Sequence, residues 1–140
     1  MEDFSKQKII YPEITKFINF YNDESHFFTN NKCFIVTGKH IAYLTALLNS
    51  SLFKYCFLDN FPELLGGTRE LRKVFIEKIP VLKVSNEINH AFETILKKIQ
   101  NANRVNSRDK KLELELDRMI FELYELTDEE KDDIGFIEIQ

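Results

Sequence analysis

The chain has 140 residues, of which 44% are hydrophobic and 30% are charged, with only 4 Gly and 3 Pro. This length and composition are those of a globular domain with a buried core, and they exclude a disordered tail. No stretch approaches the ~20 apolar residues that a membrane span needs, and the charged N-terminus lacks the apolar segment of a secretory signal. With two isolated cysteines as well, we expect a cytoplasmic, reduced protein that contacts no membrane.

The net charge of −4 is unevenly distributed along the chain. Up to Lys83 there are 11 Lys and Arg against 9 Asp and Glu, whereas from Val84 onward there are 8 against 14. The first portion therefore has a charge of +2 and the second a charge of −6. Only the first portion is suited to face nucleic acid.

Short β-prone runs occupy much of the first forty residues. Residues 8–11 form one run, which Pro12 ends, and residues 17–21 precede a polar turn at 22–25. Another run of β-branched and aromatic residues, Cys33–Thr37, is stopped by Gly38. These runs predict a small sheet.

A helical pattern follows, between Lys39 and Leu58. Apolar residues recur there at steps of three and four, at Ile41, Leu44, Leu48, Leu52 and Tyr55. This spacing predicts one amphipathic helix of about 18 residues. Residues 59–67 predict a loop, and residues 69–79 fit either a short helix or a strand that ends at Pro80.

The last third of the chain is predicted to be helical. Residues 86–100 repeat apolar side chains at helical spacing, with Ser85 as N-cap, and a polar turn is expected at 101–108. A second stripe follows at Leu112, Leu116, Met119, Ile120 and Leu123. The charged residues between these positions are expected to face water. Thr127 and Glu130 have the spacing of a capping box, which predicts one more short helix.

These elements predict an α+β fold: a small β-sheet with a packed helix, followed by a C-terminal helical hairpin and a short helix. We divide the chain into an α/β portion, residues 1–83, and a helical portion, residues 84–140. The two are expected to form one compact domain.

The residue types that carry catalysis or bind metals are scattered. His26, His40 and His90 lack the spacing of a zinc site, so we expect no metal. Cys33 and Cys56 lie in apolar runs, where a free cysteine is usually a small buried hydrophobe. The acidic residues of the tail are expected to be a solvated helix start. We therefore expect no catalytic residue in this chain.

The pair Gly66-Gly67 lacks the Lys-Ser/Thr that a phosphate loop requires, so no nucleotide cofactor site is predicted. A basic and polar cluster, Thr68-Arg69-Glu70-Leu71-Arg72-Lys73, follows these glycines directly. A flexible backbone beside arginines suits close approach to phosphates and base edges. The alternative is that these charges are solvated, or that Arg69 and Arg72 only brace the loop through neighbouring glutamates.

The amino-acid sequences of several segments, and their order along the chain, resemble a known family. They are Lys8-Ile9-Ile10-Tyr11-Pro12-Glu13-Ile14, Asn31-Lys32-Cys33-Phe34-Ile35-Val36-Thr37-Gly38, Tyr43-Leu44-Thr45-Ala46-Leu47-Leu48-Asn49-Ser50-Ser51-Leu52-Phe53-Lys54, Leu65-Gly66-Gly67-Thr68-Arg69-Glu70-Leu71-Arg72-Lys73, Ile76-Glu77-Lys78-Ile79-Pro80 and residues 116–130. Together they resemble the TaqI-like C-terminal specificity domain of type IIG restriction–modification enzymes and related adenine methyltransferases.

This resemblance implies a module that selects a DNA sequence for a methyltransferase or endonuclease. The chain has no Asn-Pro-Pro-Tyr-like motif, no glycine-rich loop for S-adenosylmethionine and no evident nuclease core. We therefore expect a fragment or a truncated gene product that does not methylate by itself. S-adenosylmethionine is expected in the methyltransferase domain of the parent, which is a partner in the same polypeptide or a separate subunit.

Double-stranded DNA is the other expected partner. The predicted base readers or phosphate anchors are Lys32, Lys39, His40, Thr68, Arg69, Arg72 and Lys73. Each competes with the interpretation that it is an ordinary surface charge. Two alternative functions remain open: a protein–protein interaction module that docks through its helical hairpin, and an enzyme fragment completed by a partner chain.

Overall fold

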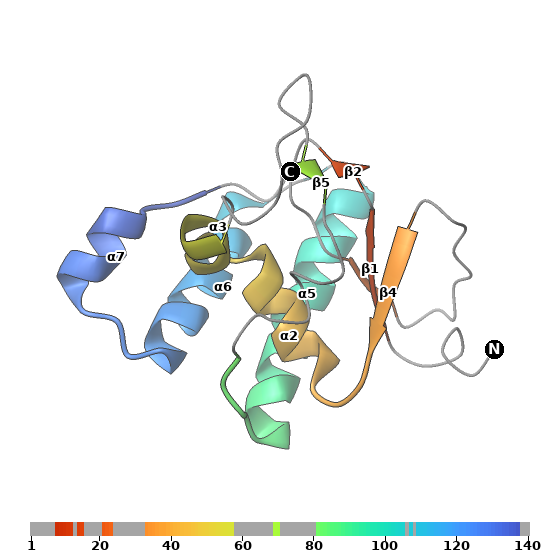
Figure 1. Cartoon of the computed structure of the whole chain (residues 1–140), viewed down its shortest axis with the longest axis horizontal. Helices are drawn as coiled ribbons and strands as arrows, with labels where there is room; N and C mark the ends of the chain where they lie inside the picture. Colours follow the sequence, from red (N-terminus) through yellow and green to blue (C-terminus); the bar gives the residue numbers. More distant parts are fainter. Residues whose placement is uncertain are drawn as a thin grey trace.

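The computed structural model describes residues 8–12, 14–15, 21–23, 33–57, 69–70, 81–105, 107 and 109–137 (Figure 1). This described part is mostly helical and contains five helices together with short strands. In Figure 1 the strands lie on one side of the molecule and helices α3, α6 and α7 on the other. None of the described helices is long and apolar enough to cross a membrane.

Three strands form an antiparallel sheet, in which β1 (Lys8–Pro12) pairs with both β3 (Tyr21–Asp23) and β4 (Cys33–Thr37). The strand predicted at Cys33–Thr37 is confirmed with its bounds. Ile9 lies opposite Val36 and is fully buried, as a β-branched residue on the core face of a central strand should be.

The predicted turn at residues 22–25 is wrong in its first half. Asn22 and Asp23 continue β3, where they lie opposite Ile9 and Lys8 of β1. Asn and Asp favour turns locally, but backbone pairing with a neighbouring strand overrides that weak preference.

A separate two-stranded ladder joins distant parts of the sequence. Here β2 (Ile14–Thr15) pairs with β5 (Arg69–Glu70), so that Thr15 lies opposite Arg69. Of the two alternatives for residues 69–79, the strand holds for these first two residues. The predicted loop at 59–67 and the rest of 69–79 lie outside the described residues.

The single helix predicted between Lys39 and Leu58 is wrong, because the structure contains two helices. They are α2 (Ile41–Asn49) and α3 (Ser51–Phe57), and between them Ser50 is extended, with φ −72° and ψ 158°. The Ser50 hydroxyl donates to the Leu47 carbonyl at 2.6 Å and accepts from the Phe53 N–H at 3.2 Å. Serine thus ends one helix and starts the next, as its short hydroxyl allows.

This break shifts α3 out of the apolar register of α2. Tyr55, a member of the predicted stripe, is 57% exposed, and Cys56 is exposed rather than buried. The expectation that Cys56 is a buried hydrophobe is therefore wrong. Cys33 lies in β4, and its side chain is outside the description.

The predicted helical hairpin is confirmed as α5 (Asn86–Arg104) and α6 (Lys110–Leu123). The Ser85 side chain accepts from the Ile88 N–H at 3.2 Å, which is the expected N-cap. Helix α5 is longer than predicted, because its last turn occupies part of the expected polar turn at 101–108.

The hydrophobic core joins α2 to this hairpin. Its buried members come from all three helices: Ala42, Tyr43, Ala46, Leu47, Phe92, Ile95, Leu96, Ile99, Leu116 and Ile120. Leu116 and Ile120 are fully buried, and the partly buried Leu112 and Leu123 pack against the same cluster. Helix α2 is therefore covered by helices from the second half of the chain.

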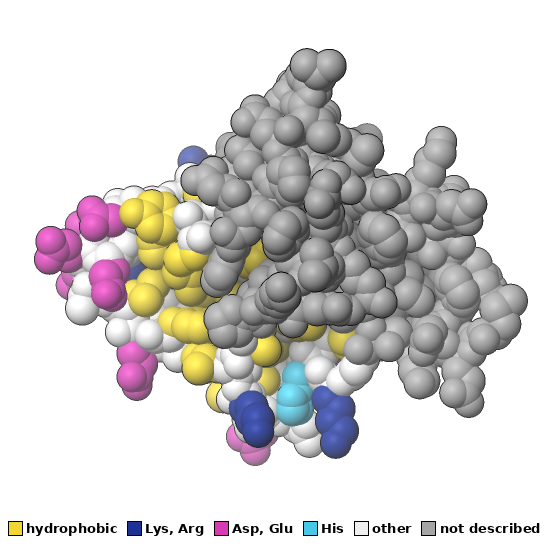
Figure 2. All heavy atoms as spheres, in the orientation of Figure 1, with side chains coloured by type: hydrophobic (Ala, Val, Ile, Leu, Met, Phe, Trp, Pro, Cys, Tyr) yellow, Lys and Arg dark blue, Asp and Glu magenta, His cyan; other side chains and the backbone are white. Residues whose placement is uncertain are grey.

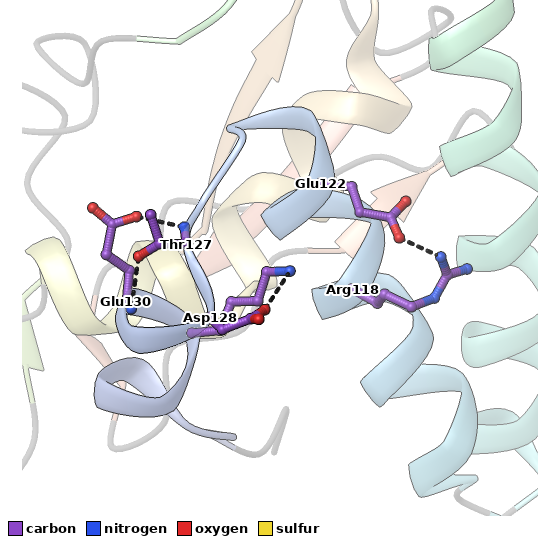
Figure 3. Close-up of polar contacts among 6 residues, drawn as sticks. Arg118, Glu122, Thr127, Asp128 and Glu130 are labelled. Atoms are coloured by element: carbon purple, nitrogen blue, oxygen red, sulfur yellow. Dashed lines mark hydrogen bonds and ion pairs between the residues drawn. The ribbon is translucent and has the colours of Figure 1, made fainter.

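The last helix, α7 (Asp128–Ile134), begins at the predicted capping box. Thr127 accepts from the Glu130 N–H, and the Glu130 carboxylate accepts from the Thr127 N–H at 2.8 Å (Figure 3). The same view shows the pair between Arg118 and Glu122, 2.7 Å apart, on the outer face of α6. Both of its members are more than half exposed, so this pair contributes little to stability.

Candidate nucleic-acid interface

The structure describes three of the seven predicted DNA-contacting residues. Lys39 and His40 lie in the loop between β4 and α2, and Arg69 begins β5. The side chain of Arg69 is not described. The other four, Lys32, Thr68, Arg72 and Lys73, lie outside the described residues. The structure therefore describes the side-chain surroundings of Lys39 and His40 only, and the predicted DNA contacts stay predictions.

The loop from Gly38 to His40 turns the chain sharply from strand into helix. Gly38 has φ 145°, a conformation that side chains rarely adopt, although a Cβ atom there would meet nothing within 4 Å. His40 has φ 56° and ψ 42°, the left-handed region that a residue with a Cβ enters only when its surroundings hold it there. Lys39, between them, is exposed.

Contacts from α5 hold this loop at the start of α2. His40 Nε2 lies 2.8 Å from the Asn86 side-chain oxygen, and the Tyr43 backbone N–H donates to the Asn89 side-chain oxygen at 2.9 Å. Because the His40 side chain makes no capping hydrogen bond to its own helix, Asn89 supplies that cap from outside. We call the group His40, Tyr43, Asn86 and Asn89 the open junction.

The Tyr43 side chain extends this junction into the core. Its hydroxyl lies 2.8 Å from that of Tyr124, and its ring packs against Phe92 with centroids 5.6 Å apart. Burial and the Tyr124 hydroxyl raise the pKa of Tyr43 above its ordinary value, against a smaller lowering by the backbone of Leu82. Tyr43 therefore stays a neutral phenol that joins α2, residue 82 and the end of α6.

The charges around the open junction are mainly basic. Lys39 and Lys83 are exposed, and the first turn of α2 contains no acidic residue. The first turn of α5 contains Glu87. Figure 2 shows Lys or Arg side chains on both sides of a histidine at the lower edge, with an acidic side chain beside one of them, and further acidic side chains at the left, where α7 lies in Figure 1.

A second polar cluster lies inside the molecule. The Asp117 carboxylate accepts from both the backbone N–H and the hydroxyl of Ser51, and the Ser51 hydroxyl accepts from the Ile137 N–H at 2.8 Å. Ser51 is fully buried, and Asp117 is 5% exposed. We call Ser51, Asp117 and Ile137 the buried clasp. It joins α3, α6 and the tail after α7.

The charged environment of this clasp contradicts the expectation that all charged residues of α6 face water. Glu113 and Asp117 are buried, as is Lys54 of α3. Burial raises the pKa of Asp117, the hydrogen bonds from Ser51 and the charge of Lys54 oppose that rise, and the charge of Glu113 adds to it. Glu113 and Asp117 are four residues apart, so this spacing was the available signal that both share one helix face.

Among the described residues, no three His, Cys, Asp or Glu side chains form a group that could hold a metal ion. His40 belongs to the open junction and His90 is exposed on α5. The sequence interpretation missed Asn86 and Asn89. Their spacing of three, on one side of the helix start, was the only local sign of a shared role.

Comparison with known families identifies the first part of the chain. The family model described as the TaqI-like C-terminal specificity domain matches residues 1–81. The match spans more than half of the chain and includes the β4–α2 loop, α2 and α3. It ends before α5, so the segment at 116–130, which also resembled the family, is outside it. No curated protein matches the chain significantly.

Proposed function

We propose that this chain, which belongs to the TaqI-like C-terminal specificity domain family, selects the DNA sequence on which a type II restriction–modification methyltransferase or endonuclease acts. The family match over residues 1–81 is the observation that carries this proposal. Membership of this family implies DNA target recognition in a restriction–modification system.

The catalytic part of the system is proposed to reside elsewhere. In this proposal a methyltransferase domain, in the parent polypeptide or in a separate subunit, binds S-adenosylmethionine and modifies the base. Base-modifying enzymes must hold one site in register, and base contacts supply the sequence dependence of that register. The specificity domain has that role and no catalytic one.

We also propose the α+β class for the whole chain. The five helices and the short antiparallel strands of the described part support it. The proposed DNA-contacting residues are those named from the sequence: Lys32, Lys39, His40, Thr68, Arg69, Arg72 and Lys73.

An exposed apolar stripe in the helical hairpin would favour the rival proposal of a protein-interaction module. Leu116 and Ile120 of that stripe are fully buried, and Leu112 and Leu123 pack against the core. These four residues are therefore used within the chain, and DNA recognition remains the function that we propose.

Selection from a randomised duplex pool tests this function. The chain is incubated with the pool at low salt, bound duplexes are recovered over several rounds, and the recovered pool is sequenced. We expect weak binding that falls steeply with salt, because the basic residues are few, and enrichment of one short sequence. A recovered pool with the same composition as the input would contradict sequence-specific recognition.

The enriched duplex then separates the roles of Arg69 and Arg72. If an arginine reads a base, its replacement by Ala should weaken the binding free energy for that duplex by about 1–3 kcal/mol and should relax the sequence preference at one position. One that grips a phosphate should weaken all duplexes alike. If Arg69→Ala and Arg72→Ala both keep the affinity and specificity of the wild type, the readers lie outside this cluster.

A further inference from the structure

We propose that the starts of α2 and α5 together form a contact surface for DNA phosphates, in which Lys83 joins Lys39 and His40. This inference rests on the proposed function of DNA recognition. It adds a residue from beyond the family match, which ends at residue 81. The segment that leads into α5 is thereby assigned a binding role as well as a structural one.

The side-chain contacts of the open junction hold together the two segments in which these lysines lie. Lys39 directly precedes His40, whose ring lies 2.8 Å from the Asn86 side-chain oxygen. Lys83 is three residues before Asn86 in the same segment. Since the Tyr43 N–H also bonds to Asn89 at 2.9 Å, the start of α2 is held against the start of α5 at two points. Lys39 therefore lies in the loop that these hydrogen bonds brace, and Lys83 lies in the segment that leads into α5.

The charges of this place suit a phosphate partner. Lys39 and Lys83 are exposed and form no ion pair with any other residue that the structure describes. A lysine ammonium is a flexible point charge that binds a phosphate oxygen without needing a defined orientation. Among the described residues at the starts of α2 and α5, Glu87 is the acidic one, so Lys39 and Lys83 outnumber the acidic residues there.

The charges at another end of the molecule indicate which face approaches DNA. Helix α7 begins with Asp128, Glu129 and Glu130, and Figure 2 shows acidic side chains grouped at that end. A DNA backbone is repelled there and attracted at the open junction. This separation of basic and acidic surfaces agrees with the sequence. The first 83 residues have a net charge of +2, and the remaining residues have a net charge of −6.

The left-handed conformation of His40 adds a reason for the bracing. Such a conformation is costly for a residue with a Cβ atom, and the hydrogen bond to Asn86 helps to hold it. A loop whose shape is set before binding loses less conformational freedom when phosphates engage it. Lys39 is thereby presented from a defined backbone position.

Fluorescence anisotropy of a labelled duplex tests the surface with charge-matched variants of the full chain. The test variant is K39Q/K83Q, and the control is K98Q/K111Q, which removes the same charge from exposed lysines elsewhere. Lys98 is twelve residues beyond Asn86, roughly 18 Å along the helix axis. Lys111 lies at the start of α6, just after the chain leaves the far end of α5.

We expect K39Q/K83Q to weaken binding on the order of 10-fold or more at low salt and to lower the slope of log affinity against log salt by about 2. K83Q alone should lower the slope by about 1. At 0.1 M salt the control should change affinity much less than K39Q/K83Q does, because its charges then lie beyond the ~10 Å screening length. Melting temperatures of all variants establish that they are folded.

The outcomes separate this inference from the function on which it rests. If the wild-type chain binds duplex DNA but K39Q/K83Q and the control have the same affinity and salt slope, the contact surface is overturned while DNA recognition stands. The same holds if K83Q alone leaves the slope unchanged. If the wild type binds no duplex even at low salt, the proposed function fails and the inference fails with it.

Discussion

Two polar connections hold the first half of the chain against the later helices, and they differ in their access to solvent. The open junction joins α2 to the start of α5 near the surface, through His40 and Asn86. The buried clasp joins α3 to α6 and the tail, through Ser51 and Asp117. Both use a side-chain oxygen of a late helix to satisfy a backbone N–H of an earlier one.

This difference in exposure separates two roles. A buried polar group must be fully hydrogen-bonded, and in this structure every buried side-chain N or O atom among the described residues has a partner. The buried clasp is therefore internal structure. The open junction leaves exposed lysines beside its hydrogen bonds, so it has charges that can meet a partner.

The largest expected effect concerns the apolar core between these two connections. Leu116 is fully buried on α6, one residue before Asp117. Leu116→Ala should lower the free energy of unfolding by about 2–5 kcal/mol, because it leaves a cavity where α2, α5 and α6 meet. The matched control is Leu114→Ala, since Leu114 is 43% exposed on the same helix. Equal denaturant midpoints for the two variants would contradict the packing of α6 described above.

The next effect concerns the buried clasp. Asp117→Ala removes the acceptor of both the Ser51 N–H and the Ser51 hydroxyl and leaves them buried. The free energy of unfolding should fall by about 1–3 kcal/mol, measured by denaturant titration. Asp133→Ala, which removes an exposed acid from α7, serves as the control. A cost no larger than that of the control would show that the clasp does not stabilise the fold.

The pH dependence of stability sharpens the same prediction. Because the pKa of Asp117 is raised in the folded state, the folded chain holds this proton more tightly than the unfolded chain does. The associated stability is present below the ordinary Asp pKa and is lost as pH rises through the raised value. Asp117→Asn does not titrate, so the wild type should lose stability relative to this variant over that window. A difference that is constant with pH would contradict the raised pKa.

The smallest effect concerns the open junction. Asn89→Ala removes the cap that α5 supplies to the Tyr43 N–H and should cost about 1 kcal/mol in the free energy of unfolding. Asn103→Ala makes the same chemical change at an exposed position of the same helix and corrects for helix propensity. Thermal unfolding of both variants tests this, and a cap that contributes nothing would give them the same melting temperature.

The elements that sequence predicted well are those specified by local chemistry. The strand Cys33–Thr37 follows from β-branched and aromatic residues, and the starts of α5 and α7 follow from Ser85 and from the Thr127–Glu130 capping box. The family resemblance depended on short sequence segments in a given order along the chain, and the match over residues 1–81 confirms it.

Two of the errors share a physical cause, because each depended on contacts between residues distant in sequence, whereas the third, at Ser50, is local. Asn22 and Asp23 have turn chemistry, yet they pair with β1. Glu113 and Asp117 look like solvated charges, yet they are buried. Periodicity predicted a continuous helix across Ser50, where hydrogen bonds to Leu47 and Phe53 instead mark its division.

The sequence by itself determined the family, the uneven charge and the starts of α5 and α7, because motifs, charges and caps are local properties of the chain. Only the tertiary structure decided that Asn86 and Asn89 complete the loop at His40 and that Asp117 satisfies Ser51. Asn89 is 46 residues from the Tyr43 N–H that it accepts from, and Asp117 is 66 residues from the Ser51 N–H. No periodic pattern in the sequence specifies which side-chain acceptor will bond to which of these N–H groups. Burial of the shared core brings them together, and the hydrogen bonds then form between the groups that it leaves facing one another.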